Sequence, residues 1–231
     1  MSRGQRATSR VSYGGCVAVE VKICGLTRSV DAELADSAGA AYLGVIFAGG
    51  PRERSPLDAR ATLFGRRARK VGVFAGREDA EIASVAEVVG LDVLQLHDGA
   101  DAERIAALRA TTGLEIWAVV RTASGALPDG IDELSDAADA LVVDAHVAGR
   151  LGGTGTVIPW RQLAESLAAM RARHRIVLAG GLTPNNVAEA IGYVSPMVVD
   201  VSSGVESAPG IKDSRMVRAF ISAVRATGTD A

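Results

Sequence analysis

The chain has 231 residues, of which 48% are hydrophobic and 4% aromatic, and its formal net charge at pH 7 is −2. This length suits one large domain or two small ones with a sizeable core, and the near-neutral charge excludes the strong basic surface typical of nucleic-acid-binding proteins. No apolar run reaches the ~20 residues that span a membrane, and the first dozen residues lack the apolar stretch of a signal peptide. We therefore expect a cytoplasmic protein that binds neither nucleic acid nor membrane.

The N-terminal segment differs from the rest of the chain. Residues 1–17 show no regular apolar pattern, and we predict that they form a flexible extension. Cys16 and Cys24 are too close, with a predicted strand between them, to form a disulfide, and two thiols in 231 residues are typical of a reducing compartment. The role of the extension stays open, and the sequence allows either a monomer or a homodimer.

Short apolar strands alternate with Ala-rich amphipathic helices along residues 18–231. Each strand ends in glycine or a polar residue, and the spacing between strands is that of βα units. The eight predicted strands are Val19–Ile23, Tyr42–Phe47, Val71–Phe74, Val93–Leu96, Glu115–Val119, Ala140–Val143, Ile176–Ala179 and Val198–Val201.

Several intervening helices have recognisable ends. Glycines able to cap a helix C-terminus follow three of them: Gly39 after Asp31–Ala38, Gly90 after Glu78–Val89, and Gly113 near the end of Ala102–Ala110. Thr183 and Pro184 have the residue types of an N-cap and a first helical position, and we predict a helix from there to Gly192. The basic run at residues 66–70 is interpreted as the last turn of a helix.

Eight such units form either a closed barrel or a doubly wound open sheet. The even repeat favours the barrel, as does the absence of a Gly-x-Gly-x-x-Gly sequence after the first strand. We predict a single-domain α/β fold, a (β/α)8 TIM barrel over residues 18–231.

The active site of this fold lies at the C-terminal ends of the strands. Gly180 and Gly181 follow the seventh strand, Ser202, Ser203 and Gly204 follow the eighth, and a third Gly-rich loop at residues 152–155 follows the sixth. Backbone amides in such turns can bind phosphate, and the loops after strands 7 and 8 are its usual site in barrels. Tight βα turns are the alternative for any single loop, but three clustered loops favour a phosphorylated small molecule.

Acid–base candidates also lie at strand ends. From its position alone, Cys24 fits a buried structural cysteine and a reactive thiol equally well. Asp144 ends the sixth strand, where a buried carboxylate is costly unless it is used or paired. His97 alone could be an ordinary loop histidine, but Gln95, two residues earlier on the same face, favours a substrate contact. No cluster has metal-ligand spacing, so we expect no metal.

Taken in order, the strand-end motifs resemble those of the phosphoribosylanthranilate isomerase family over about residues 19–220. The matching segments are Lys22-Ile23-Cys24-Gly25-Leu26-Thr27-Arg28, Gly44-Val45-Ile46-Phe47, Val71-Gly72-Val73-Phe74, Leu94-Gln95-Leu96-His97, Val142-Val143-Asp144, Gly152-Gly153-Thr154-Gly155, Leu178-Ala179-Gly180-Gly181-Leu182-Thr183-Pro184-Asn185-Asn186-Val187 and Asp200-Val201-Ser202-Ser203-Gly204-Val205-Glu206.

The resemblance implies an Amadori rearrangement of an aminoaldose phosphate to an aminoketose phosphate in tryptophan biosynthesis, with no cofactor. It implies Cys24 as general base, Asp144 as general acid, and Arg52 at the anthranilate end of the substrate. Gln95, His97 and Asp200 match other pocket positions. The phosphate-binding positions that it implies are Gly155, Gly180, Gly181, Ser203 and Gly204.

Some features depart from the family pattern. Gly50-Pro51-Arg52 replaces the usual Ser-Pro-Arg and is followed by Arg54, so either Arg52 or Arg54 is expected to contact the aromatic carboxylate. A histidine-pathway isomerase is one alternative, but it would usually have an aspartate where this chain has Cys24. An indole-glycerol-phosphate synthase would need several catalytic lysines. A non-catalytic sugar-phosphate-binding barrel is the alternative of a different class, and the presence of both Cys24 and Asp144 argues against it.

Overall fold

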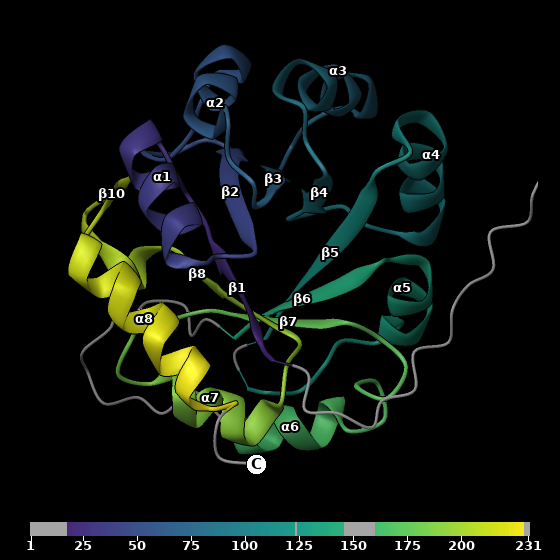
Figure 1. Cartoon of the computed structure of the whole chain (residues 1–231). Helices are drawn as coiled ribbons and strands as arrows, with labels where there is room; N and C mark the ends of the chain where they lie inside the picture. The colour runs from purple at the N-terminus through teal and green to yellow at the C-terminus, as the bar shows by residue number, and fades with distance from the viewer. Residues whose placement is uncertain (1–17, 123, 146–159, 229–231) are drawn as a thin grey trace, which may run out of the picture.

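Eight parallel strands close in chain order into a barrel in the computed structural model, which describes residues 18–122, 124–145 and 160–228 (Figure 1). The predicted (β/α)8 architecture is confirmed. The strands are β1 (Glu20–Ile23), β2 (Tyr42–Phe47), β3 (Arg69–Phe74), β4 (Val93–Leu96), β5 (Glu115–Arg121), β6 (Ala140–Asp144), β7 (Ile176–Ala179) and β8 (Val198–Val201).

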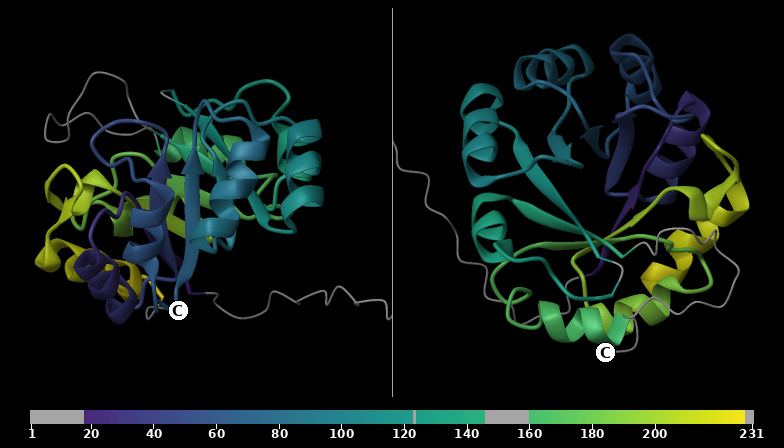
Figure 2. Two further views of the ribbon diagram at one scale, coloured as in Figure 1. Left: turned by 90° about the horizontal axis from the view of Figure 1, so that it is seen from above. Right: turned by 180° about the vertical axis from the view of Figure 1, so that it is seen from behind.

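Helices form an outer ring around the strands (Figures 1 and 2). They are α1 (Ser29–Ala38), α2 (Pro56–Leu63), α3 (Asp79–Val89), α4 (Ala102–Thr112), α5 (Ile131–Ala137), α6 (Trp160–Leu167), α7 (Val187–Val194) and α8 (Ser214–Ala226). In the described residues, no helix is long and apolar enough to cross a membrane.

One addition to the barrel follows β8. A short 3₁₀ turn, η1 (Ser203–Val205), leads into an antiparallel hairpin of β9 (Glu206–Ala208) and β10 (Ile211–Lys212). This hairpin lies beside α1 at the edge of the barrel (Figure 1). The sequence did not predict it, because its strands have only three and two residues and no apolar alternation.

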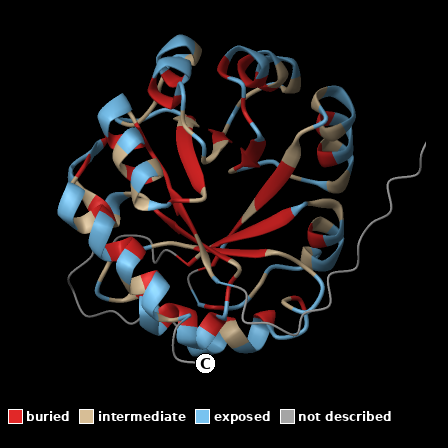
Figure 3. Ribbon diagram, viewed as in Figure 1, coloured by how far each residue is buried: buried red, intermediate tan, exposed pale blue. Residues whose placement is uncertain are grey.

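The core has two parts because strand side chains alternate between the helices and the barrel interior. The strands are buried on both faces, whereas each helix buries only its inner side (Figure 3). The interior cluster is built from one face of the strands and contains Tyr42, Val71, Val93, Trp117, Ala140, Val142, Val177 and Val198. Within this cluster, Tyr42 and Trp117 make an edge-to-face contact with ring centroids 5.0 Å apart.

The predicted helix ends are partly correct. Gly39, Gly90 and Gly113 cap α1, α3 and α4 in the left-handed conformation, as expected. The predicted helix start at Thr183 is wrong. The Asn186 side chain accepts a hydrogen bond from the Thr183 amide, and residues 184–186 form a turn before α7. Gly192 lies inside α7, which ends instead at Val194.

The basic run at residues 66–70 does not end a helix. Helix α2 stops at Leu63, because Phe64 takes an extended conformation with ψ 132°. The run therefore crosses the following loop and enters β3 at Arg69. The proposed N-terminal extension (residues 1–17) and the third Gly-rich loop, with Gly155, lie outside the described residues.

Candidate active site

A cavity of about 490 Å³ opens at the C-terminal ends of the strands. Its polar lining combines residues that are distant in sequence: Cys24, Gln95, His97, Arg121, Asp144, Asp200, Ser202 and Ser203. The period of two along a strand explains why these residues converge. On β8, for example, Val198 faces the interior, so Asp200 and Ser202 follow it on the same face nearer the mouth.

Cys24 lies at the end of β1 and is 6% exposed. Its amide donates to the carbonyl of Val201 on β8 at 2.8 Å, which fixes the backbone that carries the thiol. Gly44 on β2 lies directly beside it, since a Cβ built on Gly44 would be 2.8 Å from the Cys24 Sγ. Burial raises the pKa of the Cys24 thiol, while the ammonium group of Lys22 acts in the opposite direction.

A buried ion pair between Lys22 and Asp200 lies next to the thiol. The Lys22 Nζ donates to the Asp200 Oδ2 at 2.7 Å, with the two side chains 0% and 8% exposed. Burial alone would lower the pKa of Lys22, but the charges of Asp200 and Cys24 reverse the shift and raise it. Lys22 therefore carries its positive charge inside the barrel, next to the thiol.

Asp144 ends β6, which is three strands from β1 around the closed barrel, so its carboxyl group enters the cavity from another side. Its Oδ1 is buried and accepts no hydrogen bond from the described residues. Arg121, at the end of β5, is the register partner of Asp144 and lines the same cavity. A buried carboxylate oxygen without a partner is costly, so it is well suited to a ligand.

Gln95 and His97 extend the face of β4 into the cavity. The Gln95 Oε1 and the His97 Nδ1 are buried and have no hydrogen-bond partner in the described part of the chain. Burial lowers the pKa of His97, and the charge of Arg121 adds to this effect. The imidazole is therefore neutral at pH 7, so one ring nitrogen can donate a hydrogen bond to a ligand and the other can accept one.

The loops after β7 and β8 form the wall opposite β3 and β4. Gly180 and Gly181 have positive φ angles of 93° and 64°, and their amides donate to no group in residues 18–122, 124–145 or 160–228. Ser203 and Gly204 begin η1, so their amides precede its first internal hydrogen bond. The two loops touch, because a Cβ on Gly204 would lie 1.8 Å from the Leu182 carbonyl oxygen. This arrangement gives four amides that can face one anion.

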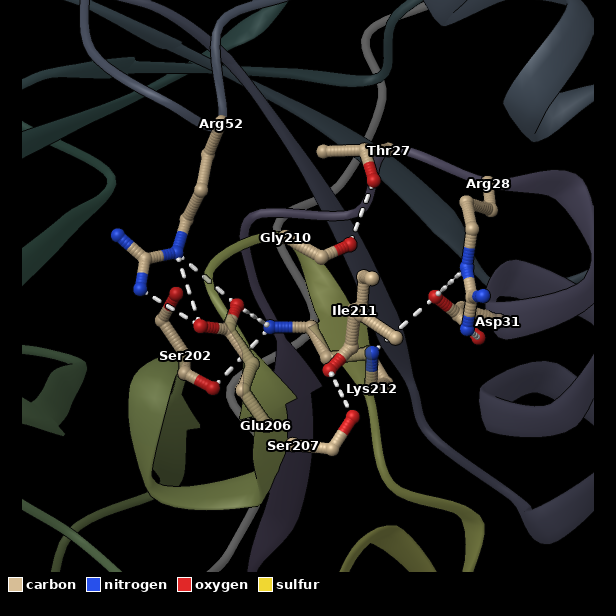
Figure 4. Close-up of polar contacts among 10 residues, drawn as sticks. All are labelled: Thr27, Arg28, Asp31, Arg52, Ser202, Glu206, Ser207, Gly210, Ile211 and Lys212. Carbon is tan, nitrogen blue, oxygen red and sulfur yellow. Dashed lines mark hydrogen bonds and ion pairs between the residues drawn. The ribbon is translucent and has the colours of Figure 1, made fainter.

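Arg52 and Arg54 separate in the structure. Arg54 lines a different cavity between α2 and α3, with Phe47 and Arg77. Arg52 does not line the mouth cavity directly, but its Cδ packs over Gly25, the residue after Cys24. Its guanidinium pairs with Glu206 of β9 at 2.6 Å, as Figure 4 shows. Arg52 is thus the arginine of this pair that lies beside the thiol.

The structure brings together most of the predicted site residues in one cavity: Cys24, Gln95, His97, Asp144, Gly180, Gly181, Asp200, Ser203 and Gly204. Sequence reasoning did not include Lys22 or Arg121 among the candidate site residues. Alternation could have found both, because Lys22 precedes Cys24 by two residues and Arg121 follows the interior-facing Val119 by two. Among the described residues, no group of three His, Cys, Asp or Glu side chains could hold a metal ion.

Known proteins similar to this chain share one description. A family model described as N-(5'phosphoribosyl)anthranilate (PRA) isomerase matches residues 21–223. A relative from Paracoccus denitrificans named N-(5'-phosphoribosyl)anthranilate isomerase is 42% identical over 214 residues, which cover 89% of this chain and 96% of the relative.

Solved structures of the same kind also match. Phosphoribosyl anthranilate isomerase from Thermotoga maritima superposes with a TM-score of 0.78 at 32% identity, covering 90% of this chain and 99% of that one. A second structure, of a phosphoribosyl anthranilate isomerase in complex with reduced 1-(o-carboxyphenylamino)-1-deoxyribulose 5-phosphate, matches with a TM-score of 0.75 at 31% identity and the same coverage.

Proposed function

The chain belongs to the family of N-(5'-phosphoribosyl)anthranilate isomerases, and we propose that Cys24 and Asp144 are the base and the acid of its reaction. The enzyme converts N-(5'-phosphoribosyl)anthranilate to 1-(2-carboxyphenylamino)-1-deoxyribulose 5-phosphate in tryptophan biosynthesis. The observation that carries the proposal is the shared cavity, into which a thiol and an unpartnered carboxyl group enter from different strands.

In the first step, the protonated carboxyl group of Asp144 gives its proton to the ring oxygen of the furanose. The bond from that oxygen to C1' breaks, and the nitrogen lone pair forms a protonated Schiff base. Because the substrate nitrogen accepts the electrons that the next step releases, the chemistry needs no separate electron sink. Asp144 suits this role because its Oδ1 is buried and makes no other hydrogen bond within the described residues.

In the second step, the Cys24 thiolate removes the proton from C2'. The electrons of that C–H bond form the C1'–C2' double bond of an enolamine and neutralise the nitrogen, and tautomerisation then gives the ketone. The ammonium group of Lys22 supports the thiolate, since its charge opposes the pKa increase caused by burial. A well-placed acid or base contributes typically ~10²–10⁴-fold in rate.

The 5'-phosphate and the anthranilate carboxylate, at the two ends of the substrate, are bound by groups that take no part in the proton transfers. We propose that the amides of Gly180, Gly181, Ser203 and Gly204 bind the 5'-phosphate, where they can approach it without side chains in the way. Arg52, which packs over Gly25 beside the thiol, binds the anthranilate carboxylate. Gln95, His97 and Asp200 contact the sugar between these ends. For Gly155, a phosphate contact remains a proposal from the sequence alone.

Two substitutions test the acid and the base. Cys24→Ser and Asp144→Asn should each lower kcat by at least ~100-fold, measured by the change in anthranilate fluorescence, while the Kd of the reduced product changes little. Cys16→Ser, which removes the other thiol, serves as the control and should retain full activity. Near-normal turnover in either variant would remove that residue from the mechanism.

The proposal also includes a cytoplasmic location and a monomeric or homodimeric state. Metabolite enzymes that act on soluble phosphorylated substrates need no membrane or nucleic-acid partner. Light scattering across a concentration series distinguishes monomer from dimer, and either result is compatible with the mechanism, because all the proposed groups come from one chain.

A further inference from the structure

Two buried charges lie on the β9–β10 hairpin, which the reaction does not use. The side chains of Lys212 and Glu206 are 0% and 4% exposed, and the Lys212 Nζ donates to the Glu206 Oε1 at 2.7 Å. The same Nζ donates to the Ser202 carbonyl at 3.1 Å. Two of the chain's three lysines, Lys22 and Lys212, are buried, although lysine is almost never fully buried unless it is paired.

Glu206 connects Lys212 to Arg52. The Nε and Nη2 atoms of Arg52 donate to the two carboxylate oxygens of Glu206, at 2.9 Å to Oε1 and 2.6 Å to Oε2. A guanidinium has two edges that can each bind a carboxylate. Nη1 makes no hydrogen bond to the described residues and points away from Glu206 (Figure 4), so the edge formed by Nη1 and Nη2 remains available.

The hairpin itself is fixed to the start of the barrel. The Thr27 hydroxyl donates to the Gly210 carbonyl at 2.5 Å, and the Lys212 amide donates to the Asp31 Oδ2 at 3.2 Å (Figure 4). Asp31 is in turn held by Arg28. Lys212 therefore sits at a fixed place relative to β1, which carries Cys24.

The charges in this cluster do not cancel. Lys212 and Arg52 bring two positive charges, and Glu206 brings one negative charge. Burial lowers the pKa of Lys212, but its hydrogen bond to Glu206 and the charge of that carboxylate oppose this shift and favour the ammonium form. Burial alone would raise the pKa of Glu206, but hydrogen bonds from Arg52 and Lys212 lower it, so the carboxylate stays ionised. Without Lys212, Glu206 would neutralise Arg52 fully, and the end of the site assigned to the anthranilate carboxylate would carry no net charge.

We propose that Lys212 is a positioning residue that, through Glu206, orients Arg52 and leaves one net positive charge for the substrate carboxylate. This inference rests on the proposed role of Arg52. It makes the hairpin a determinant of specificity for a 2-carboxyphenyl group over a plain phenyl group.

The test compares two ligands that differ only in the carboxylate. The first is the reduced product, 1-(2-carboxyphenylamino)-1-deoxyribitol 5-phosphate, and the second is its phenylamino counterpart. The Kd of each is measured by calorimetry for the full-length enzyme, Lys212→Met and Lys212→Gln. The glutamine removes the charge but keeps a hydrogen-bond donor, so it also serves if the methionine variant does not fold.

Both Lys212 variants should bind the carboxylated ligand about tenfold more weakly, with the Kd of the phenylamino ligand within about twofold of the unmodified enzyme. Lys70→Met is the matched control, because it removes the same charge at the start of β3, at the opposite end of the barrel, and should leave both Kd values unchanged. If the Kd values of the two ligands rise by the same factor, or if neither changes, the inference is overturned.

Arg52→Met separates this inference from the one on which it rests. The relevant ratio is the Kd of the phenylamino ligand divided by the Kd of the carboxylated ligand. If this ratio falls in Arg52→Met but not in the Lys212 variants, Arg52 binds the carboxylate and Lys212 has no part in it. If the ratio is unchanged in Arg52→Met, the proposed role of Arg52 itself fails.

Discussion

Adding one methyl group at Gly44 should displace the thiol of Cys24, the proposed base, while leaving the chemistry of that side chain unchanged. The alanine Cβ would lie 2.8 Å from the Cys24 Sγ and 3.1 Å from the Cys24 Cα. Favourable contacts between heavy atoms of this kind are about 3.5–4.0 Å, so the thiol or the strand must move by roughly 0.7 Å. The backbone of Gly44 has no positive φ, so the steric contact is the only cost.

The expected magnitude follows from this displacement. A misplacement of about 1 Å can cost 10²-fold in rate, so we expect Gly44→Ala to lower kcat between about 10- and 100-fold. Overpacking in a close-packed interior should lower the free energy of unfolding by about 1–3 kcal/mol. Because β1 separates β2 from β8, the affinity for inorganic phosphate should change much less than kcat.

Anthranilate fluorescence gives kcat, and urea unfolding gives the stability of the same preparation. Gly192→Ala is the matched control, because this glycine lies inside α7 and the added Cβ would contact nothing within 4 Å apart from the adjacent helix backbone. That variant should keep its kcat and gain about 0.5–1 kcal/mol in stability. Normal turnover in Gly44→Ala, with a stability loss of the expected size, would show that the thiol position is not critical and would refute the reasoning.

Three further predictions concern the same wall of the site. Lys22→Met leaves Asp200 buried without its partner, so urea unfolding should show a loss of about 3–5 kcal/mol, and a loss under about 1 kcal/mol would contradict the ion pair's role. Because the pKa of Cys24 is raised, the thiolate fraction is small at neutral pH and grows as the pH rises. In Cys16→Ser enzyme, iodoacetamide should therefore alkylate Cys24 slowly at pH 7 and ever faster through pH 9, whereas a rate that levels off below about pH 8.5 would argue against the shift. Gly204→Ala places a Cβ 1.8 Å from the Leu182 carbonyl oxygen and forces the two phosphate loops apart, so inorganic phosphate should inhibit about tenfold more weakly; unchanged inhibition would rule out this wall as the anion site.

The strands were the most predictable part of the fold. Four of them match the predicted bounds, because each is a short apolar run between a helix and a polar strand end. Two strands differ most, by two residues each: β3 begins at Arg69 instead of Val71, and β5 continues to Arg121 beyond the predicted end at Val119. The charged side chain of Arg121 interrupts the apolar pattern at the end of β5, although the backbone pairing with β6 continues to this residue.

The site was predictable only where its residues lie directly at strand ends. Lys22 could have been placed by alternation, but a lysine inside a barrel contradicts the usual rule that lysines are exposed. The contacts of Lys212 with Glu206 and of Glu206 with Arg52 depend on tertiary structure, since Arg52 and Glu206 are 154 residues apart. No local pattern in the sequence indicates such a cluster.

The scarcity of lysine has a practical consequence. With Lys22 and Lys212 enclosed by protein, Lys70 is the one lysine side chain open to amine-coupling reagents. Lys70 lies where β3 begins, so a sensor surface or a fluorescent dye attached there would be at the opposite end from the substrate opening. Immobilisation through Lys70 should therefore orient the enzyme uniformly, with its mouth toward the solution.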